Sequence, residues 1–211
     1  MLRRADSDLE ALAELLPRLG DPSFLKTHGL RFACVSGAMA NGIASVEIVE
    51  AMSRAGMLGF FGAAGLSVER VEAALDRLKA SLGSAPWGMN LIHSPNEPAL
   101  EDAIVDLYLK KGVRLVEASA YLDLTPAIVR YRATGLRRGR GGEVFVPNRV
   151  IAKVSRVEVA RKFLYPAPEG LLRDLAASGK VTAEEAALAA EIPLADDLTA
   201  EADSGGHTDN R

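Results

Sequence analysis

The amino-acid sequence predicts a parallel α/β fold, in which short strands alternate with helices that cover a sheet. Short apolar runs alternate along the chain with stretches whose apolar residues recur at helical spacing. The first three intervals from one strand start to the next are about 25 to 30 residues, which accommodates one strand, one helix and two short loops. The expected strands are residues 32–35, 57–61, 87–91, 113–117, 149–154 and 195–202.

Composition limits the class of protein. The chain has 211 residues, a net charge of −3, 48% hydrophobic residues and 25% charged residues, which is typical of an ordered globular protein and excludes a disordered regulator. A single cysteine, Cys34, excludes a disulfide framework and indicates a reducing cytoplasm. No apolar run approaches the roughly 18 residues of a membrane span. The acidic balance argues against nucleic acid as the main partner.

The N-terminal residues 1–31 are expected to form a helical extension before the main body, which comprises residues 32–211. Ser7 and Glu10 have the spacing of a capping box, which marks a helix start. The leucines that follow at helical spacing are Leu9, Leu12, Leu15, Leu16 and Leu19. This segment therefore predicts an amphipathic helix that ends near Gly20.

The helices expected between the strands each have one apolar face. Their apolar residues are Ile43, Val46, Val49 and Met52 in the first, Val68, Val71, Leu75, Leu78 and Leu82 in the second, and Leu100, Ile104 and Leu107 in the third. The last two strand-to-strand intervals are longer, which predicts insertions at residues 130–142 and 165–192. Thr182 and Glu185 have capping-box spacing within the second insertion, so a helical cap is expected there.

Two parallel architectures fit this alternation, an open doubly wound sheet and a (β/α)₈ barrel. A doubly wound dinucleotide-binding sheet needs Gly-x-Gly-x-x-Gly directly after a strand. Here Gly56, Gly59, Gly62 and Gly65 surround a strand instead, and the P-loop motif is absent. The sequence therefore favours a TIM (β/α)₈-type barrel that is incomplete, with about six βα units and a helical insertion.

Polar residues follow each expected strand, where a parallel barrel gathers its functional groups. They are residues 36–42 after the first strand, Asn90 and His93 after the third, Glu117 and Ser119 after the fourth, Lys153 and Ser155 after the fifth, and residues 201–207 after the sixth. Structural roles are the alternative for several of these: Asn90 as a turn cap, Glu117 and Lys153 as an ion pair, and His93 as a hydrogen-bonded loop residue. His28 is expected in a solvated loop.

Two kinds of site receive little support from these residues. No His-x-x-x-His pair or cysteine cluster is present, so no metal site is expected. A Ser/His/Asp triad remains an alternative, although no Gly-x-Ser-x-Gly nucleophile elbow accompanies it. For His207, the preceding Gly205 and Gly206 permit close approach of a ligand, so a functional and a structural role are both open.

Five segments carry a resemblance to a known family: residues 36–42 (SGAMANG), 87–95 (WGMNLIHSP), 116–121 (VEASAY), 151–156 (IAKVSR) and 201–209 (EADSGGHTD). They resemble the PfaD-type enoyl reductases of polyunsaturated fatty acid and trans-acyltransferase polyketide synthases, which belong to the nitronate monooxygenase (2-nitropropane dioxygenase)-like superfamily. The resemblance implies an FMN-dependent TIM barrel that uses NADPH or NADH to reduce trans-2-enoyl thioesters on an acyl carrier protein. Asp203 and Ser204 depart from the family's Glu-Ala before Gly-Gly-His.

The resemblance also implies roles for individual residues. Gly37, Ala38 and Met39 would contact the cofactor, Asn90 would bond the edge of its ring, and Lys153 would compensate the negative charge of the reduced ring. His207 would polarise the thioester carbonyl or protonate the α-carbon. The family's phosphate-binding loops follow strands seven and eight, so we expect a C-terminally truncated chain that holds FMN weakly.

Alternatives and partners complete the expectations. The alternatives are a nitronate monooxygenase-type oxidoreductase and a non-catalytic truncated scaffold. Residues 130–149 contain six arginines and one acid, Glu143, so they form either a docking site for an acidic carrier protein or a solvated loop. The missing strands would leave an open sheet edge, which favours association with a synthase complex or with another copy of the chain.

Overall fold

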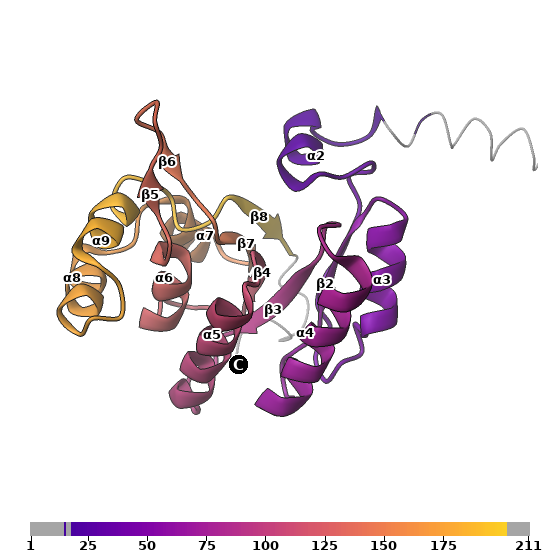
Figure 1. Cartoon of the computed structure of the whole chain (residues 1–211), viewed down its shortest axis with the longest axis horizontal. Helices are drawn as coiled ribbons and strands as arrows, with labels where there is room; N and C mark the ends of the chain where they lie inside the picture. Colours follow the sequence, from indigo (N-terminus) through magenta and orange to yellow (C-terminus); the bar gives the residue numbers. More distant parts are fainter. Residues whose placement is uncertain (1–14, 16–17, 202–211) are drawn as a thin grey trace, which may run out of the picture.

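The computed structural model describes residue 15 and residues 18–201. Its main sheet has six parallel strands in the order β1-β2-β3-β4-β7-β8 and curls into a half-barrel (Figure 1). The strands are β1 (Val35–Ser36), β2 (Leu58–Phe61), β3 (Gly88–Ile92), β4 (Leu115–Ser119), β7 (Arg149–Val154) and β8 (Asp197–Ala200). The predicted fold class, an incomplete TIM-type barrel, is confirmed.

Helices connect the strands and cover the outer face of the sheet (Figure 1). They are α3 (Val46–Arg54), α4 (Val68–Leu82), α5 (Pro98–Lys111), α6 (Pro126–Ala133), α7 (Val157–Leu164), α8 (Glu169–Ala177) and α9 (Ala183–Ala189), whereas α2 (Pro22–His28) precedes the first strand. Polar N-caps fix several starts, since the side chains of Ser45, Ser67 and Thr125 each accept a backbone N–H bond three residues on. The capping box at Thr182 and Glu185 opens α9.

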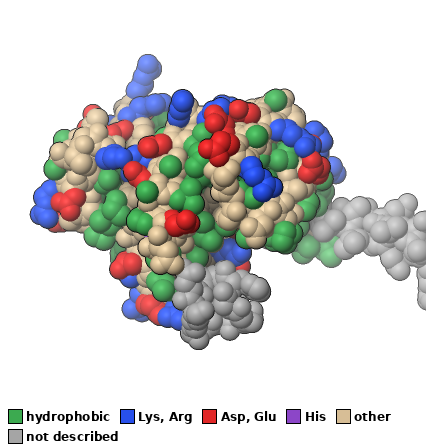
Figure 2. Space-filling model, turned by 90° about the horizontal axis from the view of Figure 1, so that it is seen from below, with side chains coloured by type: hydrophobic (Ala, Val, Ile, Leu, Met, Phe, Trp, Pro, Cys, Tyr) green, Lys and Arg blue, Asp and Glu red, His purple; other side chains and the backbone are tan. Residues whose placement is uncertain are grey.

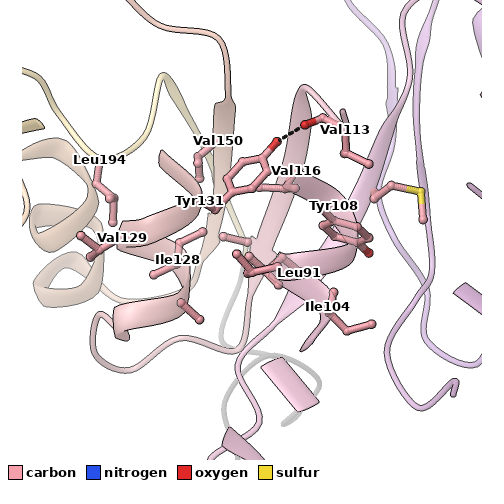
Figure 3. Close-up of a cluster of buried hydrophobic side chains, with 14 of the residues drawn as sticks. Leu91, Ile104, Tyr108, Val113, Val116, Ile128, Val129, Tyr131, Val150 and Leu194 are labelled. Atoms are coloured by element: carbon pink, nitrogen blue, oxygen red, sulfur yellow. Dashed lines mark hydrogen bonds between the residues drawn. The ribbon is translucent and has the colours of Figure 1, made fainter. Parts of the chain in front are cut away.

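The larger hydrophobic core lies between the sheet and these helices (Figure 3). Leu91 and Val116 contribute from the sheet, and Ile128 and Tyr131 from α6. The buried Tyr131 hydroxyl donates to the Val113 carbonyl oxygen at 3.1 Å, so its polar atom is satisfied within the apolar layer. The parallel strands are buried on this face along their length, as a helix-covered sheet requires.

A smaller core fills the inner face of the half-barrel near the amino ends of the strands. Phe60 and Ile151 are among its buried residues, and Phe24 from α2 packs against it. The imidazole Nε2 of His28 lies 2.8 Å from Asp197 Oδ2 at the start of β8. The expectation that His28 is a solvated loop residue is therefore wrong: it is buried in α2, which closes this end of the barrel.

The first apolar run, residues 32–35, forms less strand than predicted. β1 contains two residues, its one partner strand among the described residues is β2, and Val35 is 40% exposed. Cys34 is also exposed. An edge strand has one hydrogen-bonded neighbour, so fewer of its residues meet the criteria for a strand.

The arginine-rich segment differs from the expected loop. Arg130 and Arg132 are buried in α6, where they pair with Asp106 at 2.8 Å and Asp196 at 2.6 Å. The residues that follow form an antiparallel hairpin of β5 (Arg137–Arg138) and β6 (Val144–Phe145). The insertion predicted at residues 130–142 is therefore wrong in its first part, because Thr125 and Pro126 open a helix there.

Candidate active site

Two predicted site residues, Asn90 and Lys153, share the inner face of the sheet with Glu117, at the carboxyl ends of the strands. Along β3, β4 and β7, the neighbours of Asn90, Glu117 and Lys153 point into the helix-covered core. Because successive strand residues face opposite sides, these three side chains face the inside of the half-barrel. Asn90 pairs in register with Glu117, and Lys153 lies two residues beyond the partner of Glu117 in β7.

Asn90 is held in one orientation by its neighbours. Its Nδ2 donates to the Glu117 carbonyl oxygen at 3.1 Å and to Ser119 Oγ at 2.8 Å. The Tyr108 hydroxyl donates to the Asn90 carbonyl oxygen at 2.7 Å. The residue is 4% exposed, so the side-chain amide is fixed by the strand beside it rather than by solvent. Asn90 therefore bonds the neighbouring strand β4 and is not the turn cap that the sequence left as an alternative.

Glu117 links β4 to the loop after β1. Its Oε2 accepts the backbone N–H of Ala38 at 2.8 Å. A Cβ at Gly37 would come 3.1 Å from Oε1, so the missing side chain lets the loop approach the carboxylate. Burial raises the pKa of Glu117, while the Ala38 N–H and the charge of Lys153 lower it. The sequence indicated Glu117 as polar and buried but not as the anchor of this loop.

Lys153 lies in an ion pair with a different carboxylate from the one expected. Its Nζ is 2.9 Å from Glu201 Oε1, and the side chains are 17% and 27% exposed. Glu117 senses both charges, since Lys153 lowers its pKa and Glu201 raises it. The ammonium therefore stands beside two carboxylates at the carboxyl ends of β4 and β8.

The loop after β1 packs against the loop after β2. A Cβ at Gly62 would overlap the carbonyl oxygen of Met39, and one at Gly65 would overlap the Asn41 side chain. The Asn41 N–H donates to the Ala64 carbonyl oxygen at 2.7 Å. Met39 itself is 44% exposed, so the predicted cofactor loop presents a free apolar side chain. Glycines in the second loop thus allow the first to take its position.

A second polar cluster lies between β3 and the helices, outside the inner face. Glu101 is 3% exposed and accepts from the Tyr121 hydroxyl at 2.9 Å and from the Thr125 hydroxyl. His93 Nδ1 lies 3.1 Å from the same carboxylate, and its ring stacks on Tyr121 with centroids 5.3 Å apart. His93 is therefore the hydrogen-bonded loop residue that the sequence favoured.

The predicted catalytic residue, His207, lies outside the described residues. Its two preceding glycines and the acid at position 203 lie there too. In the part of the chain that the structure describes, the site therefore consists of the loop at Gly37–Met39 together with Asn90, Glu117 and Lys153.

These residues fit a flat ring with polar edges. The bond from the Ala38 N–H to Glu117 fixes the loop, Asn90 offers a fixed amide, and Lys153 brings a cation to the same face. A cation and a fixed amide on one inner face are groups that suit the polar edge of a flavin such as FMN. Among the described residues, no group of three or more His, Cys, Asp or Glu side chains is placed to hold a metal ion.

The fold, with this polar inner face, defines a half-barrel of the TIM-barrel class. Comparison with solved structures finds the enoyl reductase domain of MlnA, from the macrolactin cluster of Bacillus amyloliquefaciens, with a TM-score of 0.85 and 42% identity. The match covers 88% of this chain and 43% of that domain. No family model matches the sequence.

Relatives of known name agree with that structure. The chain is 53% identical to a polyunsaturated fatty acid synthase protein of Thraustochytrium sp. over 193 residues, which are 92% of this chain and 13% of the relative. It is 48% identical to the polyketide biosynthesis protein PksE of Bacillus subtilis over 192 residues, 90% of this chain and 25% of PksE. The chain is thus homologous to part of the PfaD-type enoyl reductases, and the resemblance predicted from the sequence is confirmed.

The chain matches only part of each relative, which limits the properties of the relatives that can be assigned to it. It spans less than half of the solved enoyl reductase domain and a quarter or less of the two synthase proteins. Activity, cofactor and partners therefore remain proposals.

None of the described helices has the length and apolar character needed to cross a membrane.

Replacing Glu117 with glutamine should make stability less dependent on pH. Burial holds the folded-state pKa of Glu117 above its ordinary value of 4.5, so the folded protein loses stability as pH rises from that value through the raised pKa. Glutamine keeps an acceptor for the Ala38 N–H and carries no charge. The free energy of unfolding of Glu117→Gln minus that of the wild type should therefore rise as the pH increases through this range and then level off. Urea unfolding of both proteins at a series of pH values measures this difference.

The control is Glu158→Gln, in a side chain that is 70% exposed. This substitution should change the free energy of unfolding only slightly, and by the same amount at every pH value in the range. A Glu117→Gln curve parallel to that of the wild type would show that the carboxylate is not destabilised by burial.

Proposed function

We propose that the chain belongs to an FMN-dependent enoyl reductase that reduces trans-2-enoyl thioesters carried by an acyl carrier protein in polyunsaturated fatty acid or polyketide biosynthesis. The single observation that carries the proposal is the gathering of Asn90, Glu117 and Lys153 on one inner face, beside the loop at Gly37–Met39. The 42% identity to a synthase enoyl reductase domain supports it.

The reaction adds a hydride to the β-carbon of the enoyl thioester and a proton to its α-carbon. When bound, FMN supplies the two-electron relay between NADPH or NADH and the thioester. Lys153 is proposed to stabilise negative charge at the ring edge with its ammonium, and Asn90 to orient the ring through its amide. Glu117 acts through Ala38, because its hydrogen bond sets the position of the loop against which the ring would lie.

His207 is proposed as the group that polarises the thioester carbonyl or delivers the proton to the α-carbon. An imidazole has an unperturbed pKa near 6.5, which suits proton transfer close to neutral pH. The proposal for His207 rests on the sequence alone, since Gly205 and Gly206 before it allow a substrate close approach.

The first test is the absorbance spectrum of the purified chain before and after addition of FMN, followed by NADPH- or NADH-dependent reduction of a short enoyl thioester. We expect bound flavin and a slow but measurable turnover. His207→Ala should lower that turnover by on the order of 10²-fold, while the flavin spectrum stays unchanged. Asn210→Ala, in the same C-terminal segment, is the matched control and should keep full activity.

Two results would contradict the proposal. Absence of FMN binding by the chain would assign the redox chemistry elsewhere, and an unchanged rate in His207→Ala would remove His207 from the proton transfer. Loss of activity in both variants would indicate a general effect of changes in the C-terminal segment and would equally remove the specific role of His207.

A non-catalytic scaffold is the second candidate function, and one observation favours it. Val35 on edge strand β1 is 40% exposed. An unpaired strand edge is a ready site for another segment of chain. Retained binding to a synthase partner without FMN binding would support this candidate. Neither the solved domain nor the two synthase proteins are named as nitronate monooxygenases, so that alternative is not proposed.

The partner and the location are proposals as well. The relatives are synthase proteins, which supports a synthase complex, with an acyl carrier protein as substrate carrier and the cytoplasm as location. If the carrier docks on the arginine-rich segment, Arg130 and Arg132 cannot contact it, because both side chains are buried. A homo-oligomer through the open edge at β1 stays a prediction.

A further inference from the structure

A cleft of about 750 Å³ opens at the amino ends of the strands, opposite the candidate active site. Its walls come from the α2 segment, the ends of α4 and α5, the starts of β3, β4 and β7, and the β5-β6 hairpin. In Figure 1 the hairpin and α2 stand on the same side of the molecule. The residues that matter here are Lys79, Trp87, Arg114, Arg137, Phe145 and Arg149.

Positive charge lines this cleft without compensation. No Asp or Glu is found among its described lining residues, and none of the four cations Lys79, Arg114, Arg137 and Arg149 lies within 4.0 Å of a carboxylate of the described residues. Three of them bond neutral oxygens instead. Lys79 Nζ donates to the Lys111 carbonyl oxygen at 2.6 Å, Arg114 to Asn148 Oδ1 at 2.9 Å, and Arg149 to the Thr27 carbonyl oxygen.

Some cations elsewhere on the described surface are paired with acids. Arg138, next to Arg137, is neutralised by Glu191 at 2.5 Å, and Lys111 is neutralised by Glu72 and Asp76. Figure 2, seen from below and so from the side away from α2, shows acidic and basic side chains interspersed. In a chain with a net charge of −3, four cations that share one cleft and lack acidic partners among the described residues favour an anionic ligand.

Flat side chains stand beside these cations. The Arg137 guanidinium carbon lies 3.9 Å from the centroid of the Phe145 ring, so that the guanidinium is held over the ring. Trp87 lines the same cleft and is partly buried against the core. Guanidinium and aromatic planes are surfaces on which a nucleobase can stack. The paired N–H groups of an arginine guanidinium can also bond two phosphate oxygens at once.

We propose that the cleft binds a diphosphate-bearing ligand of nucleotide size. The cations hold the phosphates and the Trp87, Phe145 and Arg137 planes contact the organic part. The volume lies in the range of small-molecule sites, about 300 to 1,000 Å³. This inference does not depend on the proposed reductase function, because the cleft lies at the other end of the barrel.

The test uses the only tryptophan of the chain as a local reporter. Trp87 lines the cleft, so its fluorescence should change when a ligand enters. The flavin-free chain is titrated with ADP, inorganic pyrophosphate and adenosine at several salt concentrations. We expect ADP or pyrophosphate to change the emission with an affinity that falls as salt rises, and adenosine to have little effect.

The variant Lys79→Gln/Arg137→Gln should weaken that binding by at least about tenfold, since two of the four charges are removed and both side chains are exposed. The matched control, Lys110→Gln/Arg173→Gln, removes two exposed charges elsewhere and should bind as the wild type does. Urea unfolding of both variants verifies that they fold.

The relative affinities test whether the organic part of the ligand contributes. Tighter binding of ADP than of pyrophosphate supports a nucleotide-sized ligand, and equal binding would overturn the contact of the three planes with an organic part. The proposal is overturned if neither compound changes the Trp87 emission, if the Lys79→Gln/Arg137→Gln variant binds normally, or if the control loses as much affinity.

Discussion

Arg132→Ala should lower the free energy of unfolding by about 3 to 5 kcal/mol, the usual cost of removing one partner from a buried ion pair. The Arg132 guanidinium is 3% exposed and lies 2.6 Å from Asp196. It also donates to the carbonyl oxygens of Asn148 and Pro193, at 3.1 Å each. Alanine would leave those acceptors and the Asp196 carboxylate without the guanidinium, at the point where α6 meets the starts of β7 and β8. Urea unfolding followed by circular dichroism measures the change.

Arg138→Ala is the matched control for this pair. Arg138 lies 2.5 Å from Glu191, but their side chains are 45% and 47% exposed, so solvent screens the pair. We expect a change within about 1 kcal/mol. Equal losses in the two variants would mean that burial does not set the contribution of Arg132, and a small loss in Arg132→Ala would mean that the surrounding structure relaxes around the missing guanidinium.

Gly62→Ala should lower the free energy of unfolding by about 3 kcal/mol, because the new methyl group overlaps backbone rather than a movable side chain. The atoms it meets are the carbonyl group and amide nitrogen of Met39. The loop would have to move, which would also strain the bond from the Gly42 N–H to the Gly62 carbonyl oxygen, 2.9 Å long. FMN binding should weaken as well, since Ala38 and Met39 belong to the displaced loop. Thermal unfolding and flavin titration measure the two effects.

Gly170→Ala provides the comparison. Gly170 lies in α8, where an added Cβ would meet no atom within 4 Å, and its backbone does not need a positive φ. Alanine favours a helix over glycine by up to about 1 kcal/mol, so this variant should be as stable as the wild type or slightly more stable. A Gly62→Ala protein as stable as Gly170→Ala would show that the two loops are not in the contact described here.

The periodicity of apolar residues was sufficient for the order of the six strands in the main sheet and for the helices α3, α4 and α5, but not for α2, α6 or the β5-β6 hairpin. The run at 149–154 became β7 with the predicted bounds, because it is buried between β4 and β8 and its apolar residues have no other place to go. The run at 32–35 looked as apolar but formed a two-residue edge strand, since nothing in a local pattern says how many neighbours a strand will have. The arginines at 130 and 132 looked like a solvated charge cluster because their acidic partners lie far along the chain or on another helix.

The candidate site was also predictable only in part. Asn90 and Lys153 were predictable, because alternation along a strand and position at its carboxyl end both act within a few residues. Bonds between distant segments were not predictable: Glu117 bonds Ala38 across 79 positions in the site, and His28 bonds Asp197 across 169 at the other end of the barrel. Local spacing therefore specifies which side chains reach the inner face of this half-barrel. Which of them touch depends on the curl of the sheet and the closeness of its loops, since contacts between distant segments arise only when the whole core packs.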